Sequence, residues 1–131
     1  MALLVDTNIF LSIAYKEASS ERAVKILSQH KNNTKISTMT TAEIIASTYK
    51  KAPELTMTVK ALVENFVSRD NIIPMDNGIA EAAGKLKAKY SPNFSMADCI
   101  ILATALKENC QALFTADPEF DKVSEIQIIK L

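Results

Sequence analysis

The chain has few of the residues that build zinc sites and disulfide frameworks. It contains two cysteines, Cys99 and Cys110, and one histidine, His30, among 131 residues. The cysteines form no C-x-x-C pair, and a structural zinc site needs four cysteine or histidine ligands. We therefore expect both cysteines to be reduced packing residues. His30 stands at the expected end of a helix, where a cation suits the helix dipole, so we expect no catalytic role for it.

The sequence also lacks a long apolar run and an excess of either charge. No stretch approaches the roughly 20 apolar residues that span a bilayer. The first residues, Met1 to Val5, lack a basic start and meet Asp6 too early to resemble a signal peptide. We therefore expect a cytoplasmic protein without a membrane association. Basic and acidic side chains number 15 each, which argues against nonspecific coating of nucleic acid, because such binding depends on phosphate neutralisation.

The size and composition are those of one ordinary globular domain. A chain of 131 residues, 48% hydrophobic and 23% charged, lies near the commonest domain size and buries roughly two-thirds of its extended surface on folding. No repeat, low-complexity tract or linker divides the sequence. Residues 1–131 are therefore expected to form a single domain.

Short apolar runs alternate with amphipathic segments along the chain. The runs that predict strands are Leu3–Val5, Lys35–Thr38, Asn71–Pro74, Ala112–Phe114 and Ile126–Ile129. Helical spacing predicts helices after the first strand, over 21–29 and 40–51, from Pro53 to Val67, from Ile79 to Tyr90, and over 93–107. This alternation predicts an α/β domain with a central parallel sheet flanked by helices on both faces.

Four acidic residues follow strands or open helices in this pattern. Asp6 ends the first strand, and Asp117 lies three residues after the strand that ends at Phe114. Glu43 lies in the expected first turn of the helix after the second strand. Because ligands bind beyond the carboxyl ends of parallel strands, these three acids should meet. Asp98 opens the apolar helix over 93–107 and joins them only if that helix begins at the same edge.

Each acid also has a purely structural interpretation as part of a helix cap. Asp6 can cap the helix that follows it, and Asp117 is a good N-cap because proline follows at the first helical position. The pairs that fit a capping box are Thr40 with Glu43 and, more weakly, Ser95 with Asp98.

Capping alone does not explain why all four positions carry a carboxylate, since serine, threonine and asparagine cap as well. Carboxylates at close quarters repel each other by about 4 kcal/mol per pair at about 4 Å with an effective dielectric constant near 20. A divalent cation removes that repulsion, and hard Mg²⁺ or Mn²⁺ prefers oxygen ligands of this kind.

The residues around the acids resemble the motifs of the PIN-domain family. These motifs are Val5-Asp6-Thr7-Asn8, Thr41-Ala42-Glu43, Ser95-Met96-Ala97-Asp98 and Phe114-Thr115-Ala116-Asp117. Their order and wide spacing are similar to those of the VapC-type toxin branch. The resemblance extends over essentially the whole chain.

This resemblance implies a ribonuclease that hydrolyses RNA phosphodiester bonds with one or two Mg²⁺ or Mn²⁺ ions. It also implies a homodimer and, for a toxin, an antitoxin partner. The residues that match the family's catalytic, metal-binding quartet are Asp6, Glu43, Asp98 and Asp117. Thr7, Asn8 and Thr115 match polar positions that support the acids or contact phosphate. We expect single-stranded or looped RNA as substrate, because a small open groove must reach one backbone strand.

Other enzyme classes fit the sequence less well. A haloacid-dehalogenase phosphatase needs a second aspartate two positions after Asp6, where this chain has Asn8. A response-regulator receiver needs a late-strand lysine, and none follows Phe114, although Asp76 resembles a phosphoacceptor. A catalytically silent PIN fold that binds RNA or serves in assembly remains the main alternative. The sequence does not separate a toxin from a housekeeping ribonuclease.

Two consecutive expected helices carry more apolar side chains than one face of a thin sheet needs. These side chains are Ile44, Ile45, Tyr49, Leu55, Val59 and Leu62. We therefore expect part of this helical hairpin to be covered by a second subunit or a partner peptide, the alternative being that all of it is core.

Three lysines are candidate phosphate contacts, namely Lys50, Lys51 and Lys89. Their alternative interpretation is a solvated helix face. Because the net charge is zero, we expect few such contacts and a gentle dependence of RNA affinity on salt.

Overall fold

Five short strands form one parallel sheet in the computed structural model, which describes residues 1–131. The strands are β1 (Leu3–Val5), β2 (Thr34–Ser37), β3 (Ile72–Ile73), β4 (Ala112–Thr115) and β5 (Gln127–Lys130). Their order across the sheet is β3-β2-β1-β4-β5. All five expected strands are thus confirmed.

The chain reverses its direction of travel across the sheet beside β1. It runs outward from β1 to β2 and β3, and then crosses back to add β4 and β5 on the other side of β1. β1 and β4 pair in register from Leu3 with Ala112 to Val5 with Phe114. At such a switch point the connections leave on opposite sides, so a crevice opens beyond the carboxyl ends of the two strands.

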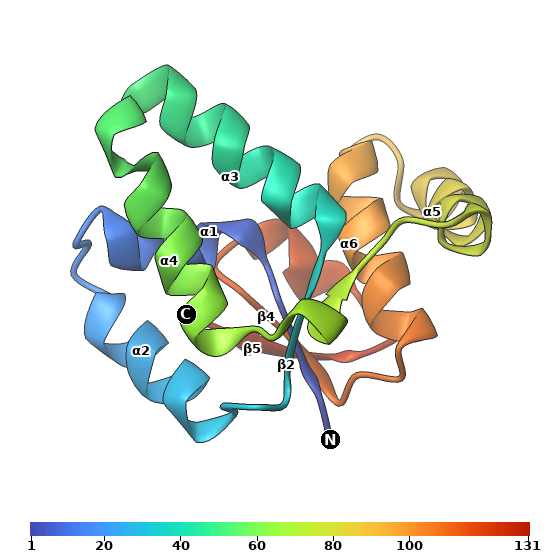
Figure 1. Cartoon of the computed structure of the whole chain (residues 1–131). Coiled ribbons are helices and arrows are strands. Elements are labelled where there is room, and N and C mark those ends of the chain that lie inside the picture. The colour runs from blue at the N-terminus through green and yellow to red at the C-terminus, as the bar shows by residue number, and fades with distance from the viewer.

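Six α-helices surround the sheet (Figure 1). They are α1 (Thr7–Ala14), α2 (Ser20–Gln29), α3 (Thr38–Lys51), α4 (Thr56–Phe66), α5 (Asn77–Tyr90) and α6 (Met96–Lys107). Three short 3₁₀ helices complete the fold, over Pro53–Leu55, Arg69–Asn71 and Pro118–Lys122. Pro53 therefore begins a 3₁₀ turn, and α4 starts only at Thr56.

The sheet is buried on both faces. On one face, Leu4 and Leu113 pack with residues of α5 and α6. On the other, Val5 and Phe114 pack with residues of α1, α2 and α4. Figure 1 shows these two groups of helices on opposite sides, with α3 running across the end of the sheet between them. The α/β class with helices on both faces is confirmed.

The helix α6 is the most deeply buried of the six. Its residues from Cys99 to Ala105 are all buried, because it packs against β2, β4, α3 and α5. Ser95 is its N-cap, and the Ser95 hydroxyl accepts a hydrogen bond of 3.0 Å from the Asp98 N–H. No helix of the chain has both the length and the apolar character needed to cross a membrane.

The structure corrects the expected start of the helix that carries Glu43. α3 begins at Thr38, directly after β2, and Ser37 is its N-cap with the Ser37 hydroxyl accepting from the Met39 N–H at 3.0 Å. The capping box between Thr40 and Glu43 is therefore wrong, since serine at the strand end caps the helix three residues before Thr40. Glu43 lies in the second turn and is not needed as a cap.

Candidate active site

The four acids predicted from the sequence line one pocket at the carboxyl edge of the sheet. The pocket has a volume of about 250 Å³. Its lining residues are Asp6, Thr7, Asn8, Leu11, Glu43, Ser47, Asp98 and Asp117. Asp98 joins the other three because α6 begins at this edge. The structure thus brings the whole quartet together at the switch point between β1 and β4.

Asp6 is both a helix cap and a wall of the pocket. The residue is 4% exposed; Oδ1 accepts a 2.8 Å hydrogen bond from the Thr7 N–H, and Oδ2 accepts a 2.7 Å bond from the Thr115 hydroxyl. Burial raises the pKa of Asp6 to about 7, although both hydrogen bonds lower it; the charges of Asp98 and Glu43 raise it further. Nothing cationic compensates the loss of water around this carboxylate.

Glu43 reaches the pocket from the second turn of α3. Its Oε1 accepts a hydrogen bond of 2.6 Å from the Thr7 hydroxyl, so the first residue of α1 holds a carboxylate of α3. Thr7 therefore touches two members of the quartet, Asp6 through its backbone and Glu43 through its side chain.

Asp98 is half-buried in the first turn of α6. Burial raises its pKa, the Ser95 hydroxyl lowers it, and the charges of Asp117 and Glu43 raise it. Asp98 and Glu43 thus lie close enough to affect Asp6, and Asp117 and Glu43 lie close enough to affect Asp98. Asp98 is therefore part of the charged cluster, in addition to donating its backbone N–H to the N-cap Ser95.

Asp117 and two polar residues complete the site. Asp117 caps the 3₁₀ helix Pro118–Lys122, with Oδ1 accepting from the Glu119 N–H at 2.9 Å. The Thr115 hydroxyl accepts from the Asp117 N–H at 3.0 Å, and the Asn8 amide oxygen accepts from the Ala116 N–H at 3.2 Å. Thr115 and Asn8 therefore fix the segment that carries Asp117.

No positive side chain neutralises this cluster. The five ion pairs of the chain all lie elsewhere, and no lysine, arginine or histidine lines the pocket. His30 lies at the end of α2, where its Nδ1 contacts the Ile26 carbonyl at 2.9 Å. The pocket is thus an acidic site without a cation supplied by the chain.

The donor set fits a hard divalent cation with an incomplete protein shell. No three acidic, histidine or cysteine side chains converge tightly enough for a closed ligand cage. Mg²⁺ keeps several waters in protein sites and is usually bound through one or two carboxylates, so a closed cage is not needed. The four carboxylates, two with pKa values raised by burial, supply the charge and oxygen chemistry that Mg²⁺ and Mn²⁺ prefer.

Leu11 and Ser47 line the pocket but were not singled out from the sequence. Helical periodicity contains the signal that finds them, because residues four apart lie on the same face of a helix. Leu11 lies four residues after Thr7 on α1, and Ser47 lies four after Glu43 on α3. Together they extend the pocket away from the acids between these two helices.

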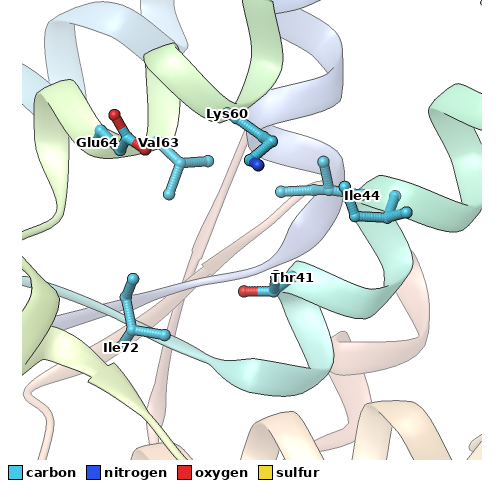
Figure 2. A pocket seen from close by; sticks show the side chains of 7 residues that line it. Thr41, Ile44, Lys60, Val63, Glu64 and Ile72 are labelled. Atoms are coloured by element: carbon cyan, nitrogen blue, oxygen red, sulfur yellow. The ribbon is translucent and has the colours of Figure 1, made fainter. Parts of the chain in front are cut away.

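A second, apolar pocket of about 100 Å³ lies between α3 and α4. Figure 2 shows Ile44, Val63 and Ile72 directed toward a common space, with Lys60 and Glu64 at its margin. Ile44 and Val59 of this helical hairpin are core residues, whereas Tyr49 is 68% and Met57 is 72% exposed. The hairpin is therefore only partly core, as expected.

The three candidate lysines differ in their surroundings. Lys50 and Lys51 are exposed in the last turn of α3 and have no acidic partner. Lys89 of α5 is paired with Glu125, with Nζ 2.9 Å from Oε2. Lys89 is therefore less available for a phosphate than the two lysines of α3.

Comparisons with known proteins identify the fold and the family. A search of curated proteins finds no match. Among solved structures, the Rickettsia felis VapBC2 complex bound to a promoter DNA fragment is similar with a TM-score of 0.79 at 20% identity, covering 99% of this chain and 98% of that chain.

Two further solved structures have the same fold. A toxin–antitoxin complex from Klebsiella pneumoniae gives a TM-score of 0.75 at 24% identity, covering 99% and 97% of the two chains. Mycobacterium tuberculosis VapC20, a toxin that cleaves the sarcin–ricin loop, gives 0.72 at 13% identity, covering 86% and 87%. The family model for the PIN domain matches residues 3–126. The chain, with its acidic quartet at the switch point of a parallel sheet, belongs to the PIN-domain family.

Proposed function

We propose that this protein is an endoribonuclease that depends on Mg²⁺ or Mn²⁺, and that it is the toxin of a toxin–antitoxin pair. PIN domains are nucleases as a family and generally use divalent metal ions. The observation that carries the proposal is the uncompensated charge of the pocket, in which four carboxylates face one another without a cation of the chain.

The proposed roles follow from the contacts of each residue. Asp6, Glu43, Asp98 and Asp117 hold the cation, and Thr115 and Thr7 hold Asp6 and Glu43 in place through hydrogen bonds of 2.7 and 2.6 Å. When bound, the cation acts as a Lewis acid that activates water and stabilises the negative charge that develops on the phosphate.

Asn8 is suited to contact the substrate. Its amide oxygen is occupied by the Ala116 N–H, and its amide NH₂ has no partner within the chain. A side-chain NH₂ can donate to a phosphate oxygen, and such contacts position a backbone without reading its sequence. Asn8 thus combines support of the Asp117 segment with a free donor at the pocket.

The proposed substrate is single-stranded or looped RNA. The pocket lies at the edge of the sheet and is open to solvent along α1 and α3, which suits one exposed backbone strand. VapC20, which has the same fold, cleaves the sarcin–ricin loop. The same substrate class, RNA, is proposed for this chain, without the specific target.

The proposed partners are a second copy of the chain and an antitoxin. Several solved structures with this fold are toxin–antitoxin complexes. The negative pocket can accept an arginine from a partner, because a guanidinium binds carboxylates through two parallel hydrogen bonds. The exposed apolar side chains of the hairpin, Tyr49 and Met57, offer a surface beside α3 for the rest of the interface.

The decisive experiment is cleavage of a single-stranded and a stem–loop RNA with Mn²⁺, Mg²⁺ or a chelator. We expect activity with either metal and none with the chelator. Asp98→Asn should lower activity by about 100- to 1,000-fold, the scale on which loss of one charge-stabilising group acts. Asp121→Asn is the matched control, since it makes the same change in a surface acid that pairs with Lys130. Metal-independent cleavage, or an active Asp98→Asn variant, contradicts the proposal, and an intact fold without any cleavage supports a silent binding module.

A further inference from the structure

We infer that Thr40 is a positioning residue for the active site and acts on Glu43 through the Thr7 hydroxyl. This inference rests on the proposed function in that it takes Glu43 as a metal ligand. Thr40 is fully buried in the first turn of α3, and its Oγ1 lies 3.3 Å from Thr7 Oγ1. The Thr40 hydroxyl forms no other hydrogen bond, so this contact is its one polar interaction in the fold.

The Thr7 hydroxyl donates toward two oxygens of α3. A threonine hydroxyl carries one proton. The shorter contact, 2.6 Å, is to Glu43 Oε1, and the longer one, 3.3 Å, is to Thr40 Oγ1. Thr40 Oγ1 therefore accepts the weaker branch of a shared hydrogen bond. The two acceptors lie on the same helix and together fix the direction of the Thr7 hydroxyl.

Three other buried helical hydroxyls bond to their own helix, whereas Thr56 of α4 donates to Thr48 Oγ1 of α3 at 2.9 Å. Ser12, Thr48 and Thr104 each donate to a backbone carbonyl three or four residues earlier in their own helix, at 2.7 to 2.9 Å. That local bond is the usual arrangement for serine and threonine inside a helix. Thr40 forms no such bond and reaches instead to α1, 33 residues away in the sequence. This difference indicates that the Thr40 hydroxyl links α3 to α1.

The contact between Thr7 and Thr40 has a geometric consequence for the site. Thr7 is the first residue of α1, and Thr40 and Glu43 are one turn apart on α3. The Thr7 side chain therefore contacts α3 at two points, and the rotamer that serves Thr40 also serves Glu43. Groups that orient a metal ligand in this way typically contribute about 10- to 100-fold to metal affinity. Thr40 acts one step further away, so we expect a value near the lower end.

The test uses substitutions that remove or retain the hydroxyl. We expect Thr40→Val to weaken Mn²⁺ binding, measured by calorimetry or electron paramagnetic resonance, by about 10-fold, and Thr40→Ser to restore affinity to within about twofold. Thr104→Val is the matched control, because it removes an equally buried hydroxyl that bonds only its own helix. Circular dichroism shows whether each variant is folded. If Thr40→Val does not fold, Thr40→Ser compared with Thr40→Ala provides the same comparison.

A double-mutant cycle separates this role from ordinary packing. If Thr40 acts through Thr7, Thr40→Val has no further effect on Mn²⁺ affinity once Thr7 is valine. Independent structural effects would instead add. Additive losses, or a Thr40→Val variant with wild-type affinity, overturn the inference.

A readout without metal makes the outcome independent of catalysis. The carboxyl ¹³C resonance of Glu43 in the metal-free protein should shift in Thr40→Val and in Thr7→Val, and should stay in place in Thr104→Val. If the wild-type protein cleaves no RNA but this pattern appears, the proposed function fails and the role of Thr40 stands. An unmoved Glu43 resonance in Thr40→Val refutes that role whether or not RNA is cleaved.

Discussion

The Thr115 hydroxyl donates a hydrogen bond of 2.7 Å to Asp6 Oδ2 across the paired ends of β4 and β1. The same hydroxyl accepts from the Asp117 N–H at 3.0 Å. One side chain thus links two carboxylate-bearing residues that are far apart in the sequence. The site is held together by hydroxyls that are themselves buried.

Thr115→Val should disturb both the metal site and the fold. It leaves the buried Asp6 carboxylate without one donor, which should cost about 1 to 3 kcal/mol of stability and about 10- to 100-fold in Mn²⁺ affinity. Thr115→Ser should retain most of both. Urea denaturation and Mn²⁺ titration measure the two effects. Wild-type affinity in Thr115→Val would show that the link is not needed for metal binding.

The metal-free protein should lose stability as the pH rises between about 4 and 7. Burial raises the pKa of Asp6 to about 7 in the folded protein, from an ordinary value of 3.8. In this window the folded state holds a proton that the unfolded chain has released, so stability falls by up to about 1.4 kcal/mol per pH unit. Stability from Asp6 is thus greatest below pH 4.

Asp6→Asn is the control for that pH dependence, since it cannot titrate. Denaturant unfolding in a chelator at several pH values should show a flatter profile for this variant. Mn²⁺ should bind wild type more tightly as the pH rises toward 7, because the cation must displace the Asp6 proton. Equal slopes in wild type and Asp6→Asn would mean that Asp6 is not the group that titrates.

The cleavage products should carry a 5′ phosphate and a 3′ hydroxyl. The pocket contains acids and no histidine, so an activated water is a better nucleophile there than the RNA 2′-hydroxyl. Product ends can be identified by mass spectrometry and by ligation with and without phosphatase. As a control, RNA with a 2′-deoxy sugar at the cleavage site should still be cut. A 2′,3′-cyclic phosphate would rule out this mechanism.

Lys50 should contact RNA, and Lys51 should not. Lys50 lies seven residues after Glu43, which places it on the same face of α3 about 10 Å further along, past Ser47. Lys51 is rotated by roughly 80° from Glu43 around the helix axis, against roughly 20° for Lys50. Oligonucleotide binding to the Asp98→Asn variant should show a salt slope that is lower by about 0.7 after Lys50→Ala and unchanged after Lys51→Ala. Equal effects would place the RNA elsewhere.

The exposed hairpin should mediate association. Tyr49 and Met57 expose 68% and 72% of their side chains, and covering them with a second subunit or an antitoxin removes apolar surface from water. Met57→Glu should weaken self-association in sedimentation equilibrium and retention of the partner in a pull-down from the native host. Met75→Glu, at a 45% exposed methionine before α5, is the control. A wild-type monomer at micromolar concentration that retains no small basic-tailed protein would contradict both interactions.

Much of the fold was accessible from local patterns. The apolar runs and helical spacings identified each strand and the order of the helices, because burial on both faces of a parallel sheet demands continuous apolar strands. The predicted start of α3, at residue 40, was two residues too late, because the helix begins at Thr38. Ser37 and Thr40 are both competent N-caps, and only the point at which β2 stops pairing with β3, at Ser37 and Ile73, selects between them.

The sequence by itself determined which residues to expect at the site, since aspartate and glutamate at strand ends and helix starts form a motif that can be recognised from the sequence. Only the tertiary structure decided that α6 begins at the same edge as Asp6, that no cation of the chain reaches the pocket, and that Thr40 faces Thr7. These facts depend on the crossing from β3 to β4 and on helix packing. Contacts between residues 33 or 109 positions apart arise from that packing, and no local pattern in the sequence encodes them.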